Sequence, residues 1–183
     1  IDYLTEDVIA QAKGFSDVAL VVVGNSGVES ADFTVEQLRL NDNHVALLDA
    51  VTAAFDQVIV VVNSGNTMDL RFLDDYPQIT SALWIGTPGP MGAVSLGKIL
   101  AGAVNPSGHL TATYARDVAS SPAAQNFGDF KYDNVEGRGL LNYEEGIYVG
   151  YRYYETRYEG DEAAYNAAVQ FPLGYGLSYT TFN

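Results

Sequence analysis

The chain has 183 residues, 48% of them hydrophobic, which is enough apolar sequence to bury the core of a folded domain. Lys and Arg number 9 against 23 Asp and Glu, and the net charge of −14 disfavours nucleic acid and anionic membranes as partners. Cysteine is absent and His44 and His109 are the only histidines, so thiolate catalysis is excluded and we expect no metal. No apolar run approaches the roughly 18–20 residues that span a bilayer. A chain without cysteine suits a bacterial cytoplasmic protein and a secreted one equally.

Residues 17–115 carry the alternating pattern of an α/β protein. Runs rich in β-branched and other apolar residues predict strands at 17–23, 58–63, 79–85 and 109–114. Apolar residues at helical spacing predict a helix that Asn41 caps and that includes Val45 to Phe55, and a second helix at 91–100. Because strands that alternate with helices pair in parallel, we expect an α/β sandwich, a mostly parallel sheet flanked by helices with flavodoxin-like layering.

The composition changes after residue 116. Small and polar residues crowd 117–129, which predicts a surface loop, and ten of the thirteen tyrosines lie between Tyr132 and Tyr179. Burial of the aromatic rings usually holds such a segment on its domain, so we interpret residues 117–183 as a long, irregular, tyrosine-rich tail packed on the same domain. The alternative is that the rings form a surface on which sugars stack.

The connection after the first predicted strand is the leading candidate for a functional site. It reads Gly24-Asn25-Ser26-Gly27-Val28-Glu29-Ser30-Ala31-Asp32, and in open α/β sheets ligands bind at the carboxyl ends of strands. Glu29 or Asp32 can act as a general acid if burial or a like charge raises its pKa, and the alternative is that both are solvated acids. The glycines do not complete the G-x-G-x-x-G pattern of dinucleotide-binding proteins, so we expect no nucleotide cofactor.

Four further features have both a structural and a functional interpretation. The Asn-Ser-Gly-Asn stretch at 63–66 can contact a ligand, but it is also ordinary turn chemistry. Trp84 lies on an apolar strand, where core packing is the expected role. Glu144 and Glu145 would point to opposite faces of extended backbone, so they are a poor acid/base pair. Arg152 stands among tyrosines, which favours stacking or a buried ion pair.

Several segments together resemble the second, α/β-sandwich domain of the glycoside hydrolase family 3 β-glucosidases and β-xylosidases. The resemblance covers residues 5–182, and its last three segments are specific as an ordered set. The segments that carry it are Asp17–Gly24 with the loop that follows, Leu38–Leu40, Val58–Asn63, Trp84–Gly89, Gly102–Leu110, Tyr143–Arg152 and Phe171–Phe182.

The resemblance implies a retaining exo-β-glycosidase that hydrolyses terminal β-D-glucosyl residues of a β-glucoside or an oligosaccharide. In this family the nucleophile is an Asp of a separate (β/α)₈ barrel, in a motif of Ser or Thr, Asp and Trp. That motif is missing here, because Leu83 precedes the only Trp, and a barrel of about 200–250 residues does not fit. We therefore expect a barrel of the same enzyme as the partner, in cis or as an associated chain, and no activity from this chain alone.

The resemblance assigns the other half of the reaction to the loop at 24–32. Glu29 matches the general acid/base of the family and Asp32 matches its loop Asp, while Asn25 and Ser26 are candidate substrate-binding or supporting residues. Two departures stand out: Val28 separates Gly27 from Glu29, and Phe33 occupies a position where Arg is common.

The resemblance also implies that residues 1–183 form one sandwich domain that lacks its first strand or strands. We then expect exposed strand edges and apolar faces. Two other functions stay open at this point. One is a non-catalytic carbohydrate-binding or scaffold domain, and the other is a flavodoxin-like nucleotide or flavin binder, which the fold class alone permits.

Overall fold

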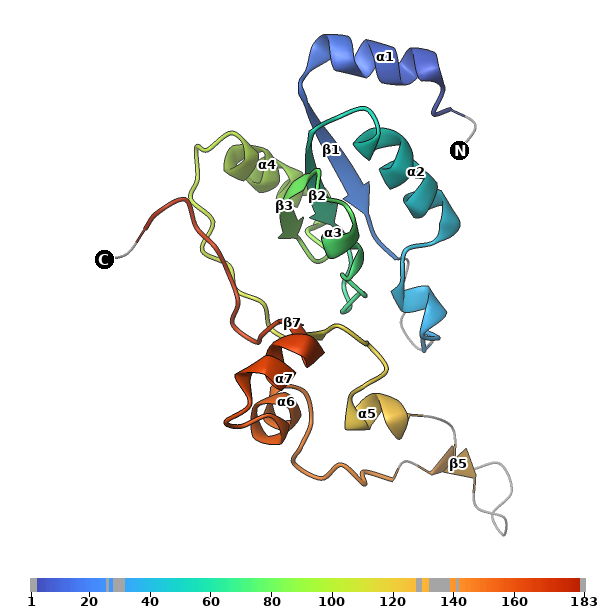
Figure 1. Cartoon of the computed structure of the whole chain (residues 1–183), viewed down its shortest axis with the longest axis vertical. Coiled ribbons are helices and arrows are strands. Elements are labelled where there is room, and N and C mark those ends of the chain that lie inside the picture. Colours follow the sequence, from blue (N-terminus) through green and yellow to red (C-terminus); the bar gives the residue numbers. More distant parts are fainter. Residues whose placement is uncertain are drawn as a thin grey trace. The chain divides into compact units, whose positions relative to one another are not determined.

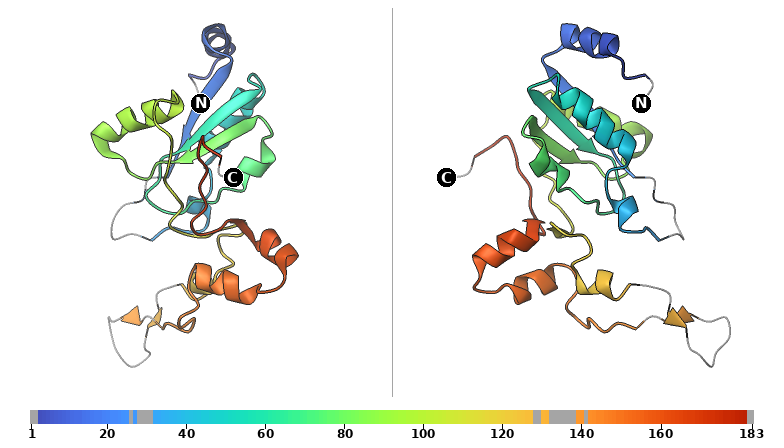
Figure 2. Two further views of the ribbon diagram at one scale, coloured as in Figure 1. Left: turned by 90° about the vertical axis from the view of Figure 1, so that its left-hand side faces the viewer. Right: turned by 45° about the vertical axis from the view of Figure 1, so that its right-hand side comes forward.

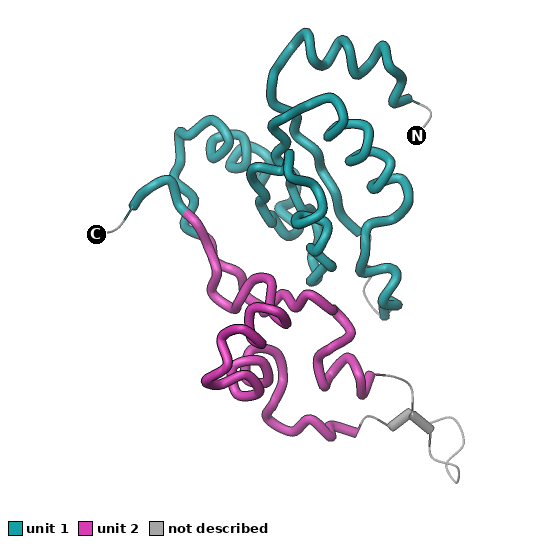
Figure 3. The backbone as a smooth tube through the Cα atoms, in the orientation of Figure 1, with its two compact units in different colours: residues 1–107, 178–183 teal, residues 108–177 magenta. Residues whose placement is uncertain are grey.

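The computed structural model describes residues 3–25, 27, 32–127, 130–131, 139–140 and 142–181. The chain divides into two compact units, which are coloured separately in Figure 3. Unit 1 comprises residues 1–107 and 178–183, and unit 2 comprises residues 108–177. The three β-branched runs and the glycine-containing loop at 24–32 all lie in unit 1, while most of the tyrosine-rich tail forms unit 2.

Unit 1 is built on a three-stranded parallel sheet in the order β1-β2-β3 (Figure 1). The strands are β1 (Val18–Val23), β2 (Gln57–Val62) and β3 (Ile79–Trp84), so the first three predicted strands are confirmed. Val23 pairs with Val62, and Val62 pairs in turn with Trp84. Because all three strands run in the same direction, their carboxyl ends share one edge of the sheet.

Helices lie on both sides of this sheet, which confirms the expected α/β class (Figures 1 and 2). Helix α2 (Asp42–Thr52) begins where the sequence predicts, because the Asn41 side chain accepts a hydrogen bond of 2.9 Å from the His44 backbone N–H. Its fully buried Leu48 joins the valines of β1 and β2 in the core. Helix α4 (Gly89–Leu100) follows β3 on the opposite side. It begins two residues earlier than predicted, since Pro90 fits the first turn of a helix.

Unit 1 has three further helical elements. Helix α1 (Glu6–Phe15), which the sequence analysis does not predict, begins at Thr5, whose hydroxyl oxygen accepts from the Val8 N–H. The 3₁₀ helix η1 (Glu36–Leu38) lies between β1 and α2, and α3 (Phe72–Asp75) lies between β2 and β3. None of the helices in the described ranges has both the length and the apolar character that crossing a bilayer requires.

Strand β1 forms one edge of the sheet and exposes apolar side chains. Val18, Leu20 and Val22 are exposed, while Val21 and Val23 on the opposite face are buried. The other edge strand, β3, instead exposes small residues at 80–82. An edge strand with exposed apolar side chains invites pairing with another chain. That the sheet lacks its first strand or strands stays a prediction.

A buried carboxylate fastens η1 to the segment after β2. Asp69 is 5% exposed, and its backbone N–H donates to the Leu38 carbonyl over 2.8 Å. Its carboxylate accepts from the Arg71 guanidinium at 2.6 Å and lies 3.5 Å from Arg39. Burial would raise the pKa of Asp69, but the hydrogen bonds from the Arg71 side chain and backbone, and the two positive charges, outweigh burial and lower it.

Unit 2 has a shorter first strand and more helix than the sequence predicts. The strand expected at 109–114 is wrong in extent: β4 comprises only Tyr114–Ala115, which pair antiparallel with β7 (Val169–Phe171). Before it, Leu110 only exchanges hydrogen bonds with Tyr175 and Gly174, and no ladder continues. The tail contains the helices α5 (Pro122–Gln125), α6 (Tyr151–Arg157) and α7 (Glu162–Ala168), and the short strands β5 (Phe130–Lys131) and β6 (Gly139–Leu140).

The tyrosines of the tail form a small core within unit 2. Buried Ala115, Tyr154 and Val169 pack together, and they are surrounded by the half-buried residues Tyr153, Tyr158, Tyr165 and Ala168. The ring of Tyr153 meets that of Tyr154 edge to face with centroids 5.1 Å apart, and the Tyr154 hydroxyl lies 3.0 Å from the Ser120 hydroxyl. Burial of aromatic rings is therefore a structural role of the tail. That the tail and the sheet form one domain stays a prediction.

We predict that Asp69→Asn destabilises the protein by about 1–3 kcal/mol at pH 7, because buried hydrogen bonds to a charged group are lost. The pKa of Asp69 is lowered in the folded state, so its contribution is present above the unfolded pKa of about 3.9 and is lost as the pH falls further. Urea unfolding of the wild type and of Asp69→Asn at several pH values from 7 to 3 measures the difference in their unfolding free energies. The difference in unfolding free energy between the two proteins should shrink toward the acidic end, and a difference that stays constant would contradict the prediction.

We also predict that the isolated chain self-associates through β1 and that Val22→Lys shifts it toward the monomer, because charged side chains block edge pairing. Val94→Lys is the matched control, since Val94 is 53% exposed on α4 and Val22 is 50% exposed. Sedimentation velocity at rising concentration measures both variants. If the wild-type chain remains monomeric, or if the two lysine substitutions reduce self-association equally, the chain does not self-associate through β1.

Candidate functional site

The three loops that leave the carboxyl edge of the sheet surround a hollow of about 440 Å³. The sequence places these loops together because β1, β2 and β3 are parallel and end at the same level. Residues of all three loops line the hollow: Asn25, Gly27, Phe33, Asn63, Gly65, Asn66 and Thr87. The lining combines amides, a hydroxyl and one aromatic ring, which is a chemistry suited to a polar ligand.

Glycines allow two of these loops to meet. A Cβ atom added to Gly24 would overlap the carbonyl oxygen of Asn63, so no larger residue fits between the ends of β1 and β2. At Gly27 an added Cβ would lie 2.7 Å from Cε2 of Phe33. Gly27 and the Phe33 ring therefore lie next to each other, one in each described part of the loop. At both positions the glycine allows a close approach that a side chain would prevent.

Ser64 is the centre of the hydrogen bonds at this edge. It is 1% exposed, and its hydroxyl donates to Asn25 Oδ1 over 2.6 Å. The Ser64 hydroxyl oxygen also lies 2.9 Å from the Asn66 carbonyl oxygen, and it accepts a hydrogen bond of 3.3 Å from the Asn66 backbone N–H. The Ser64 carbonyl oxygen accepts from Trp84 Nε1–H over 2.8 Å. One buried serine thus connects the loops after β1 and β2 with the last residue of β3.

Asn25 is held at both ends of its side-chain amide. Its Oδ1 accepts from Ser64, and its Nδ2 donates to the Gln37 carbonyl oxygen over 3.4 Å. A carbonyl oxygen needs a donor, so this pair of partners fixes the orientation of the amide. Asn25 therefore spans from the start of the β1–α2 connection to η1 near its end, and it supports the loop from within.

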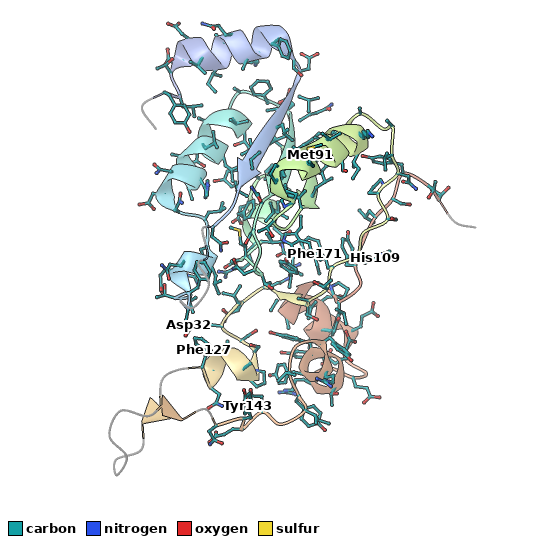
Figure 4. The ribbon with its side chains drawn as sticks, turned by 180° about the vertical axis from the view of Figure 1, so that it is seen from behind. Asp32, Met91, His109, Phe127, Tyr143 and Phe171 are labelled. Carbon is teal, nitrogen blue, oxygen red and sulfur yellow. The ribbon has the colours of Figure 1, made fainter. Side chains whose placement is uncertain are left out.

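The predicted site residues differ in what the structure says of them. Asn25 lines the hollow and is half-buried. Asp32 is exposed in the same connection, before η1 (Figure 4). Glu29 and Ser26 lie outside the described residues, as does Val28. Their expected roles as general acid/base and as a substrate-binding or supporting residue therefore stay predictions.

The structure adds residues that sequence analysis does not single out as a site. Ser64 appears there only within a turn-forming stretch, and Gln37 and Asp69 not at all. No local pattern reveals Ser64, because its partner Asn25 is 39 residues away in the sequence. Asp69 gives a weak signal, as an acid two residues before Arg71, with which it forms a bidentate ion pair.

The remaining candidates have structural roles. Trp84 is half-buried and uses its indole N–H on Ser64, as core packing with one polar contact predicts. Arg152 is exposed, and its guanidinium carbon lies 5.8 Å from the centroid of the Tyr151 ring, which fits stacking rather than a buried ion pair. Glu144 and Glu145 accept hydrogen bonds from Asn142 and Asn126, respectively. Within the described ranges, no three His, Asp or Glu residues are grouped so that they could hold a metal ion.

Comparison with known proteins identifies the family. The model of the glycosyl hydrolase family 3 C-terminal domain matches residues 4–151. The chain is 36% identical over 186 residues to β-glucosidase B of Emericella nidulans, across 99% of this chain and 21% of that protein. It is 32% identical over 180 residues to an exo-α-(1→6)-L-arabinopyranosidase of Bifidobacterium longum, across 98% of this chain and 21% of that protein.

Solved structures agree with the sequence relatives. A β-glucosidase from Paenibacillus barengoltzii has a TM-score of 0.76 and 35% sequence identity, over 97% of this chain and 18% of that chain. The chain spans about a fifth of the length of the curated relatives that it matches. Since the family model covers well over half of the residues, the chain belongs to glycosyl hydrolase family 3, where it corresponds to the C-terminal domain.

Proposed function

We propose that this chain is the acid/base-bearing domain of a retaining exo-β-glycosidase and that Glu29 is the general acid/base. The observation that carries the proposal is the similarity to β-glucosidases along 98–99% of the chain. The position of Glu29 supports it, because this residue belongs to the connection between β1 and α2, whose described ends border the hollow at the carboxyl edge.

The reaction needs a second carboxylate, which we place on a (β/α)₈ barrel of the same enzyme. In the first step an Asp of the barrel attacks the anomeric carbon, the bond to the leaving oxygen breaks, and Glu29 gives its proton to that oxygen. In the second step Glu29 takes a proton from water, the water oxygen bonds to the anomeric carbon, and the ester to Asp breaks. Retaining enzymes separate the two carboxyl groups by about 5–5.5 Å.

The chemistry of the hollow is compatible with a sugar hydroxyl or a leaving group. Asn63 and Thr87 are exposed on its lining and carry groups that both donate and accept hydrogen bonds. Phe33 offers a ring next to them. We assign Asn25 and Asp32 to support or substrate contact in the same connection, and we propose terminal β-D-glucosyl residues as the group that the whole enzyme removes.

One observation favours a second function, binding of carbohydrate by the tail without catalysis. Phe127 and Tyr143 of unit 2, both labelled in Figure 4, are 61% and 73% exposed. Tyr148 and Tyr151 are exposed as well. Aromatic rings of this kind can stack on sugars. Glycan binding by the isolated chain that is unaffected by Glu29→Gln would favour this function.

We predict that the isolated chain hydrolyses no aryl β-glucoside, whereas the full-length enzyme does, because nucleophile and acid belong to different domains. A misplacement of about 1 Å between reacting groups can already cost about 100-fold. Release of 4-nitrophenol from the β-D-glucoside, the β-D-xyloside and the α-L-arabinopyranoside measures both proteins, and circular dichroism checks that the chain is folded. Turnover by the isolated chain would contradict the prediction, and the full-length enzyme should prefer the glucoside.

We further predict that Glu29→Gln in the full-length enzyme lowers kcat/KM for cellobiose by about 10²–10⁴-fold, since protonation of a poor leaving group is lost. For 2,4-dinitrophenyl β-glucoside, whose leaving group needs no proton, the loss should stay below about tenfold. Glu36→Gln is the control, because Glu36 is an exposed carboxylate of η1 in the same connection. Equal losses on the two substrates would remove Glu29 from the acid role.

A further inference from the structure

We infer that Ser64 is a positioning residue, which holds the β1–α2 connection in place through Asn25 so that the general acid meets the leaving group. The inference rests on the proposed role of Glu29. Ser64 itself is 1% exposed, so it acts through other residues and not on substrate. Neither its position after β2 nor its turn-forming neighbours assign it this role.

The first argument is the geometry of the contact. Ser64 and Asn25 follow neighbouring parallel strands, and the hydrogen bond of 2.6 Å between their side chains joins the two loops close to where both leave the sheet. Asn25 extends this link to Gln37. A hydroxyl has a single proton, and the Asn25 oxygen is the nearest of its acceptors. The link therefore fixes where the connection leaves the sheet.

The second argument is that the other end of the connection is fastened to the same neighbouring loop. The Asp69 N–H donates to the Leu38 carbonyl oxygen, and the Asp69 carboxylate pairs with Arg39. Ser64 and Asp69 both belong to the segment between β2 and α3. The connection that contains Glu29 is thus hydrogen-bonded near its start and near its end to one and the same segment.

The third argument is the contrast with Thr52, the other buried hydroxyl residue of unit 1 among the described residues. Thr52 donates to the Leu48 carbonyl oxygen over 2.7 Å, within its own helix α2. Such a bond serves the helix locally. Ser64 instead joins different loops, so loss of its hydroxyl should affect the site and not only stability. This contrast makes Thr52→Val a matched control for Ser64→Ala.

The test uses the full-length enzyme and the leaving-group comparison. We expect Ser64→Ala to lower kcat/KM for cellobiose at least about tenfold more than kcat/KM for 2,4-dinitrophenyl β-glucoside, because a misplaced acid matters only where a proton is needed. The alkaline limb of the pH profile should move as well, since that limb reports the acid. Thr52→Val should change neither the ratio of kcat/KM for the two substrates nor the alkaline limb of the pH profile, even if it lowers the melting temperature as much as Ser64→Ala does.

Two further variants keep the outcome decisive. Asn25→Ala removes the same link from its half-exposed end, so it stands in if Ser64→Ala does not fold, and in the double variant the two effects should not add. Equal losses on both substrates, or a result for Ser64→Ala that matches Thr52→Val, would overturn the inference. Glu29→Gln, measured alongside, separates the two proposals: if it shows the leaving-group effect and Ser64→Ala does not, only the inference about Ser64 fails.

Discussion

The parallel pairing of β1 with β2 is the constraint on which the site depends. Six residues of each strand pair without a shift, from Val18 with Gln57 to Val23 with Val62. The two strands therefore end side by side, and the loops that follow them start close enough that only a glycine fits at position 24. Every link described at the carboxyl edge, from Ser64 to Asp69, is a consequence of this alignment, because it places segments that are distant in the sequence next to each other.

The parts of the fold that local patterns encode could be predicted. β-branched runs gave the three strands, and the Asn41 cap gave the start of α2, since both depend on neighbours in the sequence. The contacts of Ser64 and Asp69 depend instead on residues of another loop, and nothing in a turn-forming Asn-Ser-Gly-Asn stretch specifies which partner the serine will meet. For the same reason the start of the β1–α2 connection was predictable from the end of β1, whereas its hydrogen bonds to the neighbouring loop were not.

The tail shows the limit of composition as a signal. The density of tyrosines correctly indicated aromatic burial, but some of these tyrosines are buried within unit 2 and others lie on its surface. Tyr154 is buried on α6 and bonds to Ser120, while Tyr151 at the start of the same helix is exposed. The helices α6 and α7 have only seven residues each. Two turns are too short for a clear helical periodicity in the sequence, so the segment resembles a loop. The strand expected at 109–114 was overestimated because its apolar pattern lacked a partner strand of matching length.

Asp69 illustrates why a general acid needs support from its neighbours. Asp69 is held in place by the ion pairs of its own carboxylate with Arg71 and Arg39. These cations stabilise the charged form and thereby lower the pKa of Asp69. A group fixed in that way cannot donate a proton near neutral pH. A catalytic acid must keep its carboxyl group accessible and without a strong cation, so its position has to come from residues around it. Near the start of the connection Phe33 is uncharged, and the hydrogen bonds of Ser64 and Asn25 hold the backbone there without adding a charge. The Asp69 ion pair holds the end of the connection with charged groups, whereas Ser64 and Asn25 hold its start with neutral ones, which is the arrangement that the role proposed for Glu29 requires.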